Sequence, residues 1–351
     1  MATKFQAQRR ERGEFPATDA EFFEQFGTEQ QCLDFIVKTR WPHGFVCPKC
    51  SNRGRWIATE QVWHCDAGHS VSATCETAMH RTRTPLRTWF YSAWLICTHK
   101  PGVSALQMAA RKTKSPGYMG VWGTLHKIRD RMDQHKQRKL SGYVEADEMY
   151  VGGEERGTGH TGRGAVTKTL VAVAVEVVPW KDDKGVTHAR AGRCRMRVIR
   201  DAKQTTLEAF IADSVDSGAT VSTDAASSYG RVINLGYDHD VTVAKYDDDP
   251  LPTLGRVTTN LKRWLIGTHK GAVRKAHLQA YLNEYVFRFN SRFRPWDAFA
   301  QLLGLAAKSE RSIEYRELFA HVVHPNRGRN FPPLTGESRR NQEGSTRPKG
   351  R

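Results

Sequence analysis

The segment YVEADEMYV, residues 143–151, decides how the chain folds, because apolar and polar residues alternate along it as they do in a β-strand. Gly152 and Gly153 follow it and are typical of the end of a strand. Two further segments rich in valine and small apolar residues come next, TLVAVAVEVV at 169–178 and RCRMRVI at 193–199. We therefore predict three consecutive strands in this part of the chain.

The elements after these strands give the fold class. Residues 205–216 have a helical pattern, ATVSTD at 219–224 is a short strand, and a further strand is expected in 239–246. Two helices are then expected at 257–266 and 275–292. Three strands, a helix, two more strands and then helices is the element order of a ribonuclease-H-like domain. The predicted class is therefore α/β, with a mixed sheet flanked by helices.

Two aspartates occupy informative places on this predicted sheet. Asp147 lies within the first strand and Asp224 ends the fourth. In this topology the two strands are neighbours, so both carboxylates converge and suit Mg²⁺ or Mn²⁺. Period-2 alternation puts Glu145 on the face of Asp147, as a weaker candidate, and Glu148 on the opposite face. The alternative is that both aspartates are ordinary surface or turn acids.

The chain before residue 140 has helical rather than strand-like hydrophobic periodicity. A helical pattern begins at Asp19 and is broken by Pro42 and Gly44. Helical character returns over 85–135, and residues 102–132 predict two helices around a Ser-Pro-Gly turn. This layout fits a helix-turn-helix, although any helical hairpin has the same pattern.

A cysteine-rich stretch lies between the two helical regions. Cys47 and Cys50 form a knuckle whose two thiolates can hold one tetrahedral zinc ion. Cys65 lies at the distance expected for the second half of such a site, but the next knuckle position is Gly68. His69 follows, so we predict a structural Zn²⁺ site of Cys47, Cys50, Cys65 and His69. The alternative is that the first two cysteines only line a small core.

Charge and composition restrict the partners. The chain has 54 Lys and Arg against 37 Asp and Glu, a formal net charge of +17, which favours a polyanion and above all nucleic acid. Its seven cysteines are an odd set and fit reduced thiols or metal ligands better than disulfides. No long apolar segment or signal-peptide pattern is present, so we expect a cytoplasmic protein with no membrane partner.

Several longer motifs resemble those of one known family. They are RWPHGFVCPKC (40–50), HRTRTPLRTWF (80–90), EADEMYVGG (145–153), NLKRWLIGTHKGAV (260–273) and HLQAYLNEYVFRFNSR (277–292). From about Phe22 to about Leu305 the chain resembles the insertion-sequence transposases of the fifteen-ninety-five group, the ISXO type. The resemblance implies a zinc ribbon, a ribonuclease-H-like DDE domain and a divalent metal. It also implies double-stranded DNA partners, namely element ends and target DNA, a homodimer or higher oligomer, and a place at the bacterial nucleoid.

The resemblance also assigns catalytic positions. Asp147 matches the first catalytic carboxylate of the family, and Asp224 matches the second. Lys262 matches a lysine seven positions after the third catalytic residue, which is Glu, Asn or His in relatives. That alignment places the third residue on Gly255. The chain also departs from the family at Gly68, where the second knuckle usually has cysteine.

Three residues are candidates for the missing third ligand. Asn260 lies one to two turns further along the same predicted helix, and its amide oxygen is a weak Mg²⁺ ligand. Glu284 lies on the next helix and matches an acid of the family, with an ion pair to Arg288 at i+4 as its alternative role. Asp248 lies in the preceding YDDDP loop and is the weakest of the three.

Three functions are consistent with these features. The first is an active transposase that binds terminal inverted repeats, cleaves a strand and transfers the exposed 3′-OH to target DNA. The second is a catalytically degenerate transposase that still binds DNA, which Gly68 and Gly255 favour. The third is an unrelated zinc-ribbon nucleic-acid module, which the strand-borne Asp147 and Asp224 disfavour.

The sequence also predicts how the chain is divided. The predicted divisions are a loose arm (1–18), a helix with the zinc ribbon (19–80), a helix-turn-helix-like region (81–140), the catalytic domain (141–305) and a C-terminal extension with a disordered basic tail (306–351).

Overall fold

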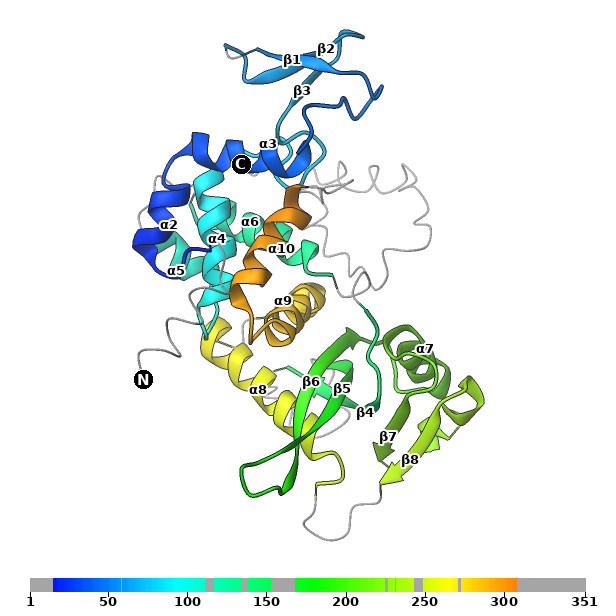
Figure 1. Ribbon diagram of the computed structural model, residues 1–351. Helices are drawn as coiled ribbons and strands as arrows, with labels where there is room; N and C mark the ends of the chain where they lie inside the picture. Colours follow the sequence, from blue (N-terminus) through cyan, green and yellow to red (C-terminus); the bar gives the residue numbers. More distant parts are fainter. Residues whose placement is uncertain are drawn as a thin grey trace, which may run out of the picture.

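The computed structural model shows three parts, which Figure 1 presents together: a small sheet, a helical bundle and a larger sheet with its own helices. The residues that the structure describes are 15–57, 59–110, 117–133, 138–152, 168–224, 227–230, 232–242, 249–270 and 273–307. None of the helices formed by these residues has the length and hydropathy needed to span a bilayer.

The small sheet has three antiparallel strands in the order β1-β2-β3. They are β1 (Gly54–Ile57), β2 (Val62–Cys65) and β3 (Ser70–Ser72). Its core is minimal, since only Phe45, Cys47, Cys65 and Val71 are buried in it. The Phe45 and Trp63 rings stack with their centroids 5.3 Å apart. So little apolar burial cannot stabilise an independent module, and this part needs a further cross-link.

The helical bundle is built first from the N-terminal segments. Its helices are α2 (Asp19–Phe26), α3 (Glu29–Arg40), α4 (Leu86–Thr98), α5 (Ala105–Ala110) and α6 (Tyr118–Arg131). The continuous helical pattern from Asp19 is divided in two, because Thr28 caps α3 in a reciprocal capping box with Gln31. Half of the residues of α6 are buried, and Tyr118 and Met119 are exposed at its start. The predicted Ser-Pro-Gly turn falls largely in residues 111–116, outside the described residues.

A C-terminal helix completes the same bundle. Helix α10 (Pro295–Ala307) packs against α4, α3 and α6, as Figure 1 shows for its orange ribbon among the blue and cyan helices. Phe299 lies in the bundle core with Phe22 and Phe26. The sequence had grouped this segment with the catalytic domain, within 141–305. The structure places it in the helical core instead, because its apolar face matches that core.

The start of the described chain also belongs to the bundle. The Phe15 ring packs edge-on against Phe299, and the Trp94 indole N–H donates to the Pro16 carbonyl over 2.8 Å. Phe15 and Pro16, in the segment 1–18 expected to be a loose arm, are therefore packed against the bundle. Residues 1–14 and 308–351 of the predicted arm and tail lie outside the described residues.

The larger sheet has five strands in the order β6-β5-β4-β7-β8. They are β4 (Tyr143–Val151), β5 (Thr169–Lys181), β6 (Thr187–Val198), β7 (Thr220–Asp224) and β8 (Asp238–Thr242). The pairs β4·β5 and β5·β6 are antiparallel, whereas β4·β7 and β7·β8 are parallel. This is the mixed sheet of a ribonuclease-H-like fold, and it confirms the predicted class.

Two strands are longer than their hydrophobic pattern indicates. The hairpin of β5 and β6 remains paired as far as Lys181 and Thr187. Its outer part is exposed on both strands, so it carries no apolar alternation that a sequence pattern detects. The buried parts of these strands match the segments predicted from valine-rich sequence.

Helices cover both faces of this sheet. Helix α7 (Gln204–Ser214) shares a core with Val144 and Ala146 of β4. Helices α8 (Pro252–His269) and α9 (Leu278–Asn290) share the other core with Met149. Because successive side chains of a strand point to opposite faces, Glu145 and Asp147 point to the α8 side and Glu148 to the α7 side.

Candidate metal centres

Parallel pairing of β4 and β7 brings the two predicted catalytic aspartates to one place. The register pairs Val144 with Val221 and Glu145 with Ser222. The paired residues end there, and the same register continued two residues along both strands would put Asp147 level with Asp224, which ends β7. Both side chains are partly exposed, so solvent and ligands reach them.

Tyr229 lies near several of these acids, in a short 3-10 turn after β7 (Ser227–Tyr229). Its hydroxyl donates to Glu148 Oε2 over 2.7 Å. Burial, and next the charge of Glu148, raise the pKa of the Tyr229 phenol well above its usual value, and Asp147 and Asp224 contribute to the same rise. Both aspartates therefore lie close to one phenol. Tyr229 was not singled out from the sequence, and its place five residues after Asp224 is the only local signal for it.

Glu145 anchors α8 onto β4. Its Oε2 accepts the backbone N–H of Leu254 over 2.6 Å, in the first turn of α8. The side chain is only 5% exposed, and burial raises the pKa of the Glu145 carboxyl, while hydrogen bonds from Leu254 and Thr253 oppose that rise. An acid at a helix N-terminus satisfies free N–H groups and the helix dipole. Glu145, two positions before Asp147 on β4, thus fixes the start of α8 against this strand.

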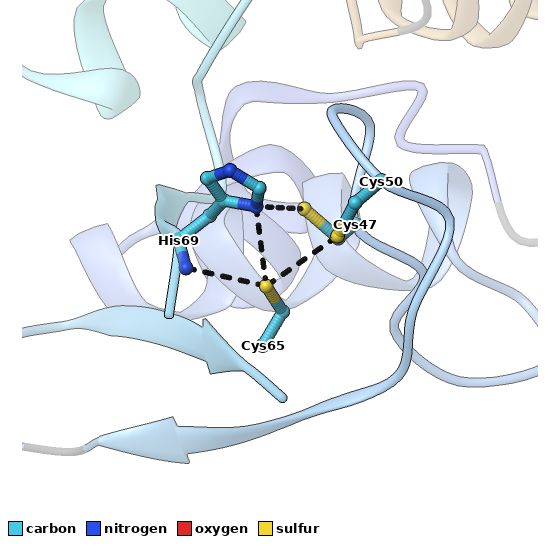
Figure 2. A group of neighbouring side chains, drawn as sticks. All are labelled: Cys47, Cys50, Cys65 and His69. Atoms are coloured by element: carbon cyan, nitrogen blue, oxygen red, sulfur yellow. Dashed lines mark hydrogen bonds between the residues drawn. The ribbon is translucent and has the colours of Figure 1, made fainter. Parts of the chain in front are cut away.

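The four predicted zinc ligands converge in the ribbon, as Figure 2 shows. The Cys50 and Cys65 sulfurs are 3.6 Å apart, and His69 Nδ1 lies 3.4 Å from Cys65 Sγ and 3.8 Å from Cys47 Sγ. The edges of a tetrahedron around zinc are about 3.8 Å between two sulfurs and about 3.6 Å between sulfur and nitrogen. The geometry and the donor set therefore fit a zinc ion.

The turn after Cys65 explains how histidine replaces the expected cysteine. Gly68 adopts a positive φ of 81° and donates its N–H to the Cys65 carbonyl over 2.8 Å. This left-handed conformation favours glycine and turns the chain so that His69 faces the cluster. The His69 N–H also donates to Cys65 Sγ over 3.3 Å. The longer imidazole side chain reaches the cluster from one position further along the chain.

Two segments of the chain match known protein families. Residues 139–290 match the ISXO2-like transposase domain, and residues 27–71 match the transposase zinc-ribbon domain. The chain belongs to the ISXO2-like transposases. This confirms the family that the sequence motifs resemble. No curated protein matches the chain.

Glu284 of the transposase domain lies away from solvent, on α9. It is fully buried, and its Oε2 accepts from Arg129 Nε of α6 over 2.7 Å. Arg288 lies 3.9 Å from its other oxygen. This geometry supports the alternative role considered from the sequence, an ion pair, although its main partner is Arg129 rather than Arg288. Glu284 therefore joins the transposase domain to the helical bundle.

Helix α8 of the transposase domain carries the other three positions of interest. Gly255 and Lys262 lie seven residues apart, almost two full turns, and so share one flank of the helix. Asn260 lies about 140° around the helix from Gly255. It sits between Val257 and Trp264, both of which contact Tyr285 of α9. Asn260 therefore faces the α9 side, and Lys262 is exposed on the other flank.

The acids of the transposase domain do not form a compact trio. Among the described residues, the zinc cluster is the only set of three or more His, Cys, Asp and Glu side chains whose ligand atoms all lie within 4.8 Å of one another. Asp248 lies outside the described residues. Its neighbour Asp249 is described and exposed, and the sequence had given no reason to choose it among three consecutive aspartates.

Proposed function

We propose that the protein is a DNA transposase that binds the terminal inverted repeats of an insertion sequence and performs metal-dependent strand cleavage and strand transfer. The observation that supports this proposal is the parallel pairing of β4 and β7 in a transposase domain, because a continuation of that register by two residues would bring Asp147 and Asp224 together. The degenerate DNA-binding protein is the second candidate, and Gly255 at the third catalytic position is what favours it.

The donor set at these strands fits a divalent metal ion. Asp147 and Asp224 offer carboxylate oxygens that are partly exposed, which is the ligand type that Mg²⁺ and Mn²⁺ prefer. When bound, the metal activates the attacking oxygen and stabilises the leaving one in phosphoryl transfer. Helix α8 packs over β4, β5 and β6, so the β7 side of the aspartates is the approach we propose for a DNA strand.

The protein's own groups orient this site. The Glu148 N–H donates to Asp147 Oδ1 over 2.7 Å, which holds that carboxylate in one rotamer. Glu145 fixes the start of α8, and α8 in turn presents Lys262 to solvent. A lysine there is suited to hold a phosphate of the cleaved end. We propose Asp147 and Asp224 as the metal-ligating pair and Lys262 as a phosphate contact.

We propose that Cys47, Cys50, Cys65 and His69 hold one structural zinc ion. All four tetrahedral positions are then filled by protein, which leaves no open position for a substrate. The ion would replace the apolar core that this small sheet lacks.

The test of the proposed function is nicking of DNA that contains the element ends, with Mn²⁺. Wild type is expected to cut, and Asp147→Asn and Asp224→Asn to lose cleavage by roughly a hundredfold or more while still binding DNA. Asp183→Asn, at an exposed acid of the β5–β6 hairpin, is the matched control and keeps full activity. Wild-type protein that binds the ends tightly and cuts none of them would leave the degenerate binder standing.

DNA binding itself should be strongly electrostatic, since the net charge is +17. Each neutralised phosphate releases counterions, so the logarithm of the binding constant should fall steeply with the logarithm of the salt concentration. A titration by fluorescence anisotropy from low to physiological salt measures this slope. A nearly flat plot would contradict a phosphate-dominated interface. On DNA we expect a homodimer or higher oligomer.

A further inference from the structure

The segment that joins the ribbon to the helical bundle is strongly basic. It connects β3 to α4, at the base of the small sheet in Figure 1, and it contains the start of the HRTRTPLRTWF motif (80–90). Residues 77–99 include three arginines and no aspartate or glutamate. The ribbon itself, residues 41–76, is electrically balanced, with Lys49, Arg53 and Arg55 against Glu60, Asp66 and Glu76. Of these two segments, the one beside the ribbon sheet therefore carries the net positive charge.

The threonines of this segment hold it against the bundle. The Trp89 indole N–H of α4 donates to Thr82 Oγ1 over 3.0 Å, and the Thr84 N–H donates to the same oxygen over 3.1 Å. Thr84 is buried, and its Oγ1 accepts from Thr124 Oγ1 of α6 over 3.3 Å. The backbone around Thr82 is thus fixed to two helices.

Arg81 and Arg83 flank Thr82 and are both exposed. Neither of them forms an ion pair with an acid of the described residues. Arg87 is exposed as well, but the Glu29 carboxylate lies next to it and accepts its backbone N–H over 3.0 Å. Arg81 and Arg83 therefore present two guanidinium groups on fixed backbone, and no described acid neutralises them.

The backbone of Arg81 has a conformation that suits glycine. Its φ is 51°, in the left-handed region, where any side chain strains the backbone and glycine does not. Residues held in such conformations are concentrated at functional sites. An arginine at this position, exposed and without an ion pair to a described acid, indicates that the side chain serves binding rather than stability.

We propose that Arg81 and Arg83 bind the phosphate backbone of duplex DNA, so that the DNA lies against the segment between β3 and α4 rather than on the ribbon sheet. This inference rests on the proposed function, since it assigns a surface to the DNA that a transposase binds. Arginine presents a planar fork of N–H donors that matches phosphate oxygens. Fixed backbone lowers the entropy cost of ordering these side chains on DNA. Contacts of this kind position the duplex without reading its sequence.

Fluorescence anisotropy with a labelled duplex of mixed sequence tests the proposal on the full-length, zinc-loaded protein. Arg81→Gly and Arg83→Ala should each weaken binding by roughly five- to tenfold, because each loses a phosphate contact. Each should also reduce the steepness of the logarithm of the binding constant against the logarithm of the salt concentration by about 1. Arg81→Lys keeps the charge and should keep the slope. Arg200→Ala removes an equal charge at an exposed arginine of the transposase domain and should bind as wild type does.

Thermal unfolding separates binding from stability. Glycine adopts the left-handed backbone at position 81 without strain, so Arg81→Gly should unfold at a temperature no lower than wild type does. Loss of DNA affinity without loss of stability is the expected result. A clear fall in the unfolding temperature of both Arg81→Gly and Arg83→Ala would show that these arginines support the fold, and would overturn the proposal.

Arg55→Ala, on β1, tests the ribbon sheet as the alternative surface and should lose less affinity than Arg81→Gly or Arg83→Ala. If those two variants bind duplex DNA as wild type does, only this inference is overturned, and a loss in Arg55→Ala would assign the contact to the ribbon sheet. If wild type itself has no salt-dependent affinity for duplex DNA, the proposed function is overturned, and this inference with it.

Discussion

The two candidate metal centres differ in the sequence separation of the residues that form them. In the ribbon, Cys47 and His69 are 22 positions apart, and both lie in loops next to one small sheet. In the transposase domain, the contact that sets α8 against β4 joins Glu145 to Leu254, 109 positions apart. A local site depends on its metal for its shape, whereas a long-range site depends on the packing of the whole domain.

The largest effect should follow zinc removal. Cys65→Ser, or treatment with a strong chelator, should reduce the zinc content from about one ion per chain to near zero and unfold the ribbon, because structural zinc contributes on the order of 10 kcal/mol. Amide resonances of β1–β3 should collapse, while those of the five-stranded sheet stay dispersed. Metal analysis and NMR check this. If the ribbon keeps its dispersed resonances without zinc, its fold does not depend on the metal, and the proposed difference between the two centres is wrong.

The long-range site should instead be sensitive to the buried ion pair. Arg129 and Glu284 are 1% and 0% exposed, so Arg129→Ala leaves the buried carboxylate with only the distant Arg288, 3.9 Å from its other oxygen, and should cost about 3 kcal/mol of unfolding free energy. Urea unfolding measures it, and the zinc content should not change.

A double replacement provides the control for that loss. Arg129→Met with Glu284→Leu removes both buried charges and should recover much of the stability, since Arg288 keeps its hydrogen bonds to the His99 and Lys100 carbonyls. Equal losses in the single and double variants would show that packing, not the unpaired charge, is responsible.

Acid should weaken the same interface. Burial lowers the pKa of His269 to about 4, and burial lowers that of His126 as well. The folded state therefore binds fewer protons than the unfolded state between pH 6.5 and about 4. Stability is complete above pH 6.5 and falls as the pH drops through this window, by at most about 1.4 kcal/mol per pH unit for His269. Urea unfolding of wild type and His269→Gln from pH 7 to pH 5 should show a shallower fall in the variant.

The smallest effect should come from Lys262→Ala. The side chain is exposed on α8, so the fold and the Mn²⁺ affinity should be unchanged. The loss of one phosphate contact should weaken binding of a pre-cleaved end by roughly fivefold, about 1 kcal/mol. Lys184→Ala in the β5–β6 hairpin is the matched control. Equal binding by both variants would remove Lys262 from the DNA interface.

The same contrast explains what the sequence predicts well. The cysteine spacing indicates the ribbon directly, because its ligands are close in the chain. The element order indicates the sheet, and with it the place of Asp147 and Asp224. No sequence pattern identifies Arg129 as the partner of Glu284, because the two residues are 155 positions apart. The helical i+4 spacing instead suggests Arg288, which is the more distant of the two arginines. Helix α10 was grouped with the wrong core because apolar periodicity shows that a face is buried but does not identify its partner.

The membership of α10 in the bundle has a consequence for the whole molecule. The chain leaves the bundle after α6, builds the five-stranded sheet with α7, α8 and α9, and then returns as α10. The transposase domain is thus an insertion within the helical bundle, tethered at both of its ends. A fragment that stops after α6 lacks one wall of its core and exposes Phe299's partners Phe22 and Phe26. A double tether also restricts rotation between the two parts, and in the proposed function it would keep a fixed span between the ribbon and Asp147 and Asp224.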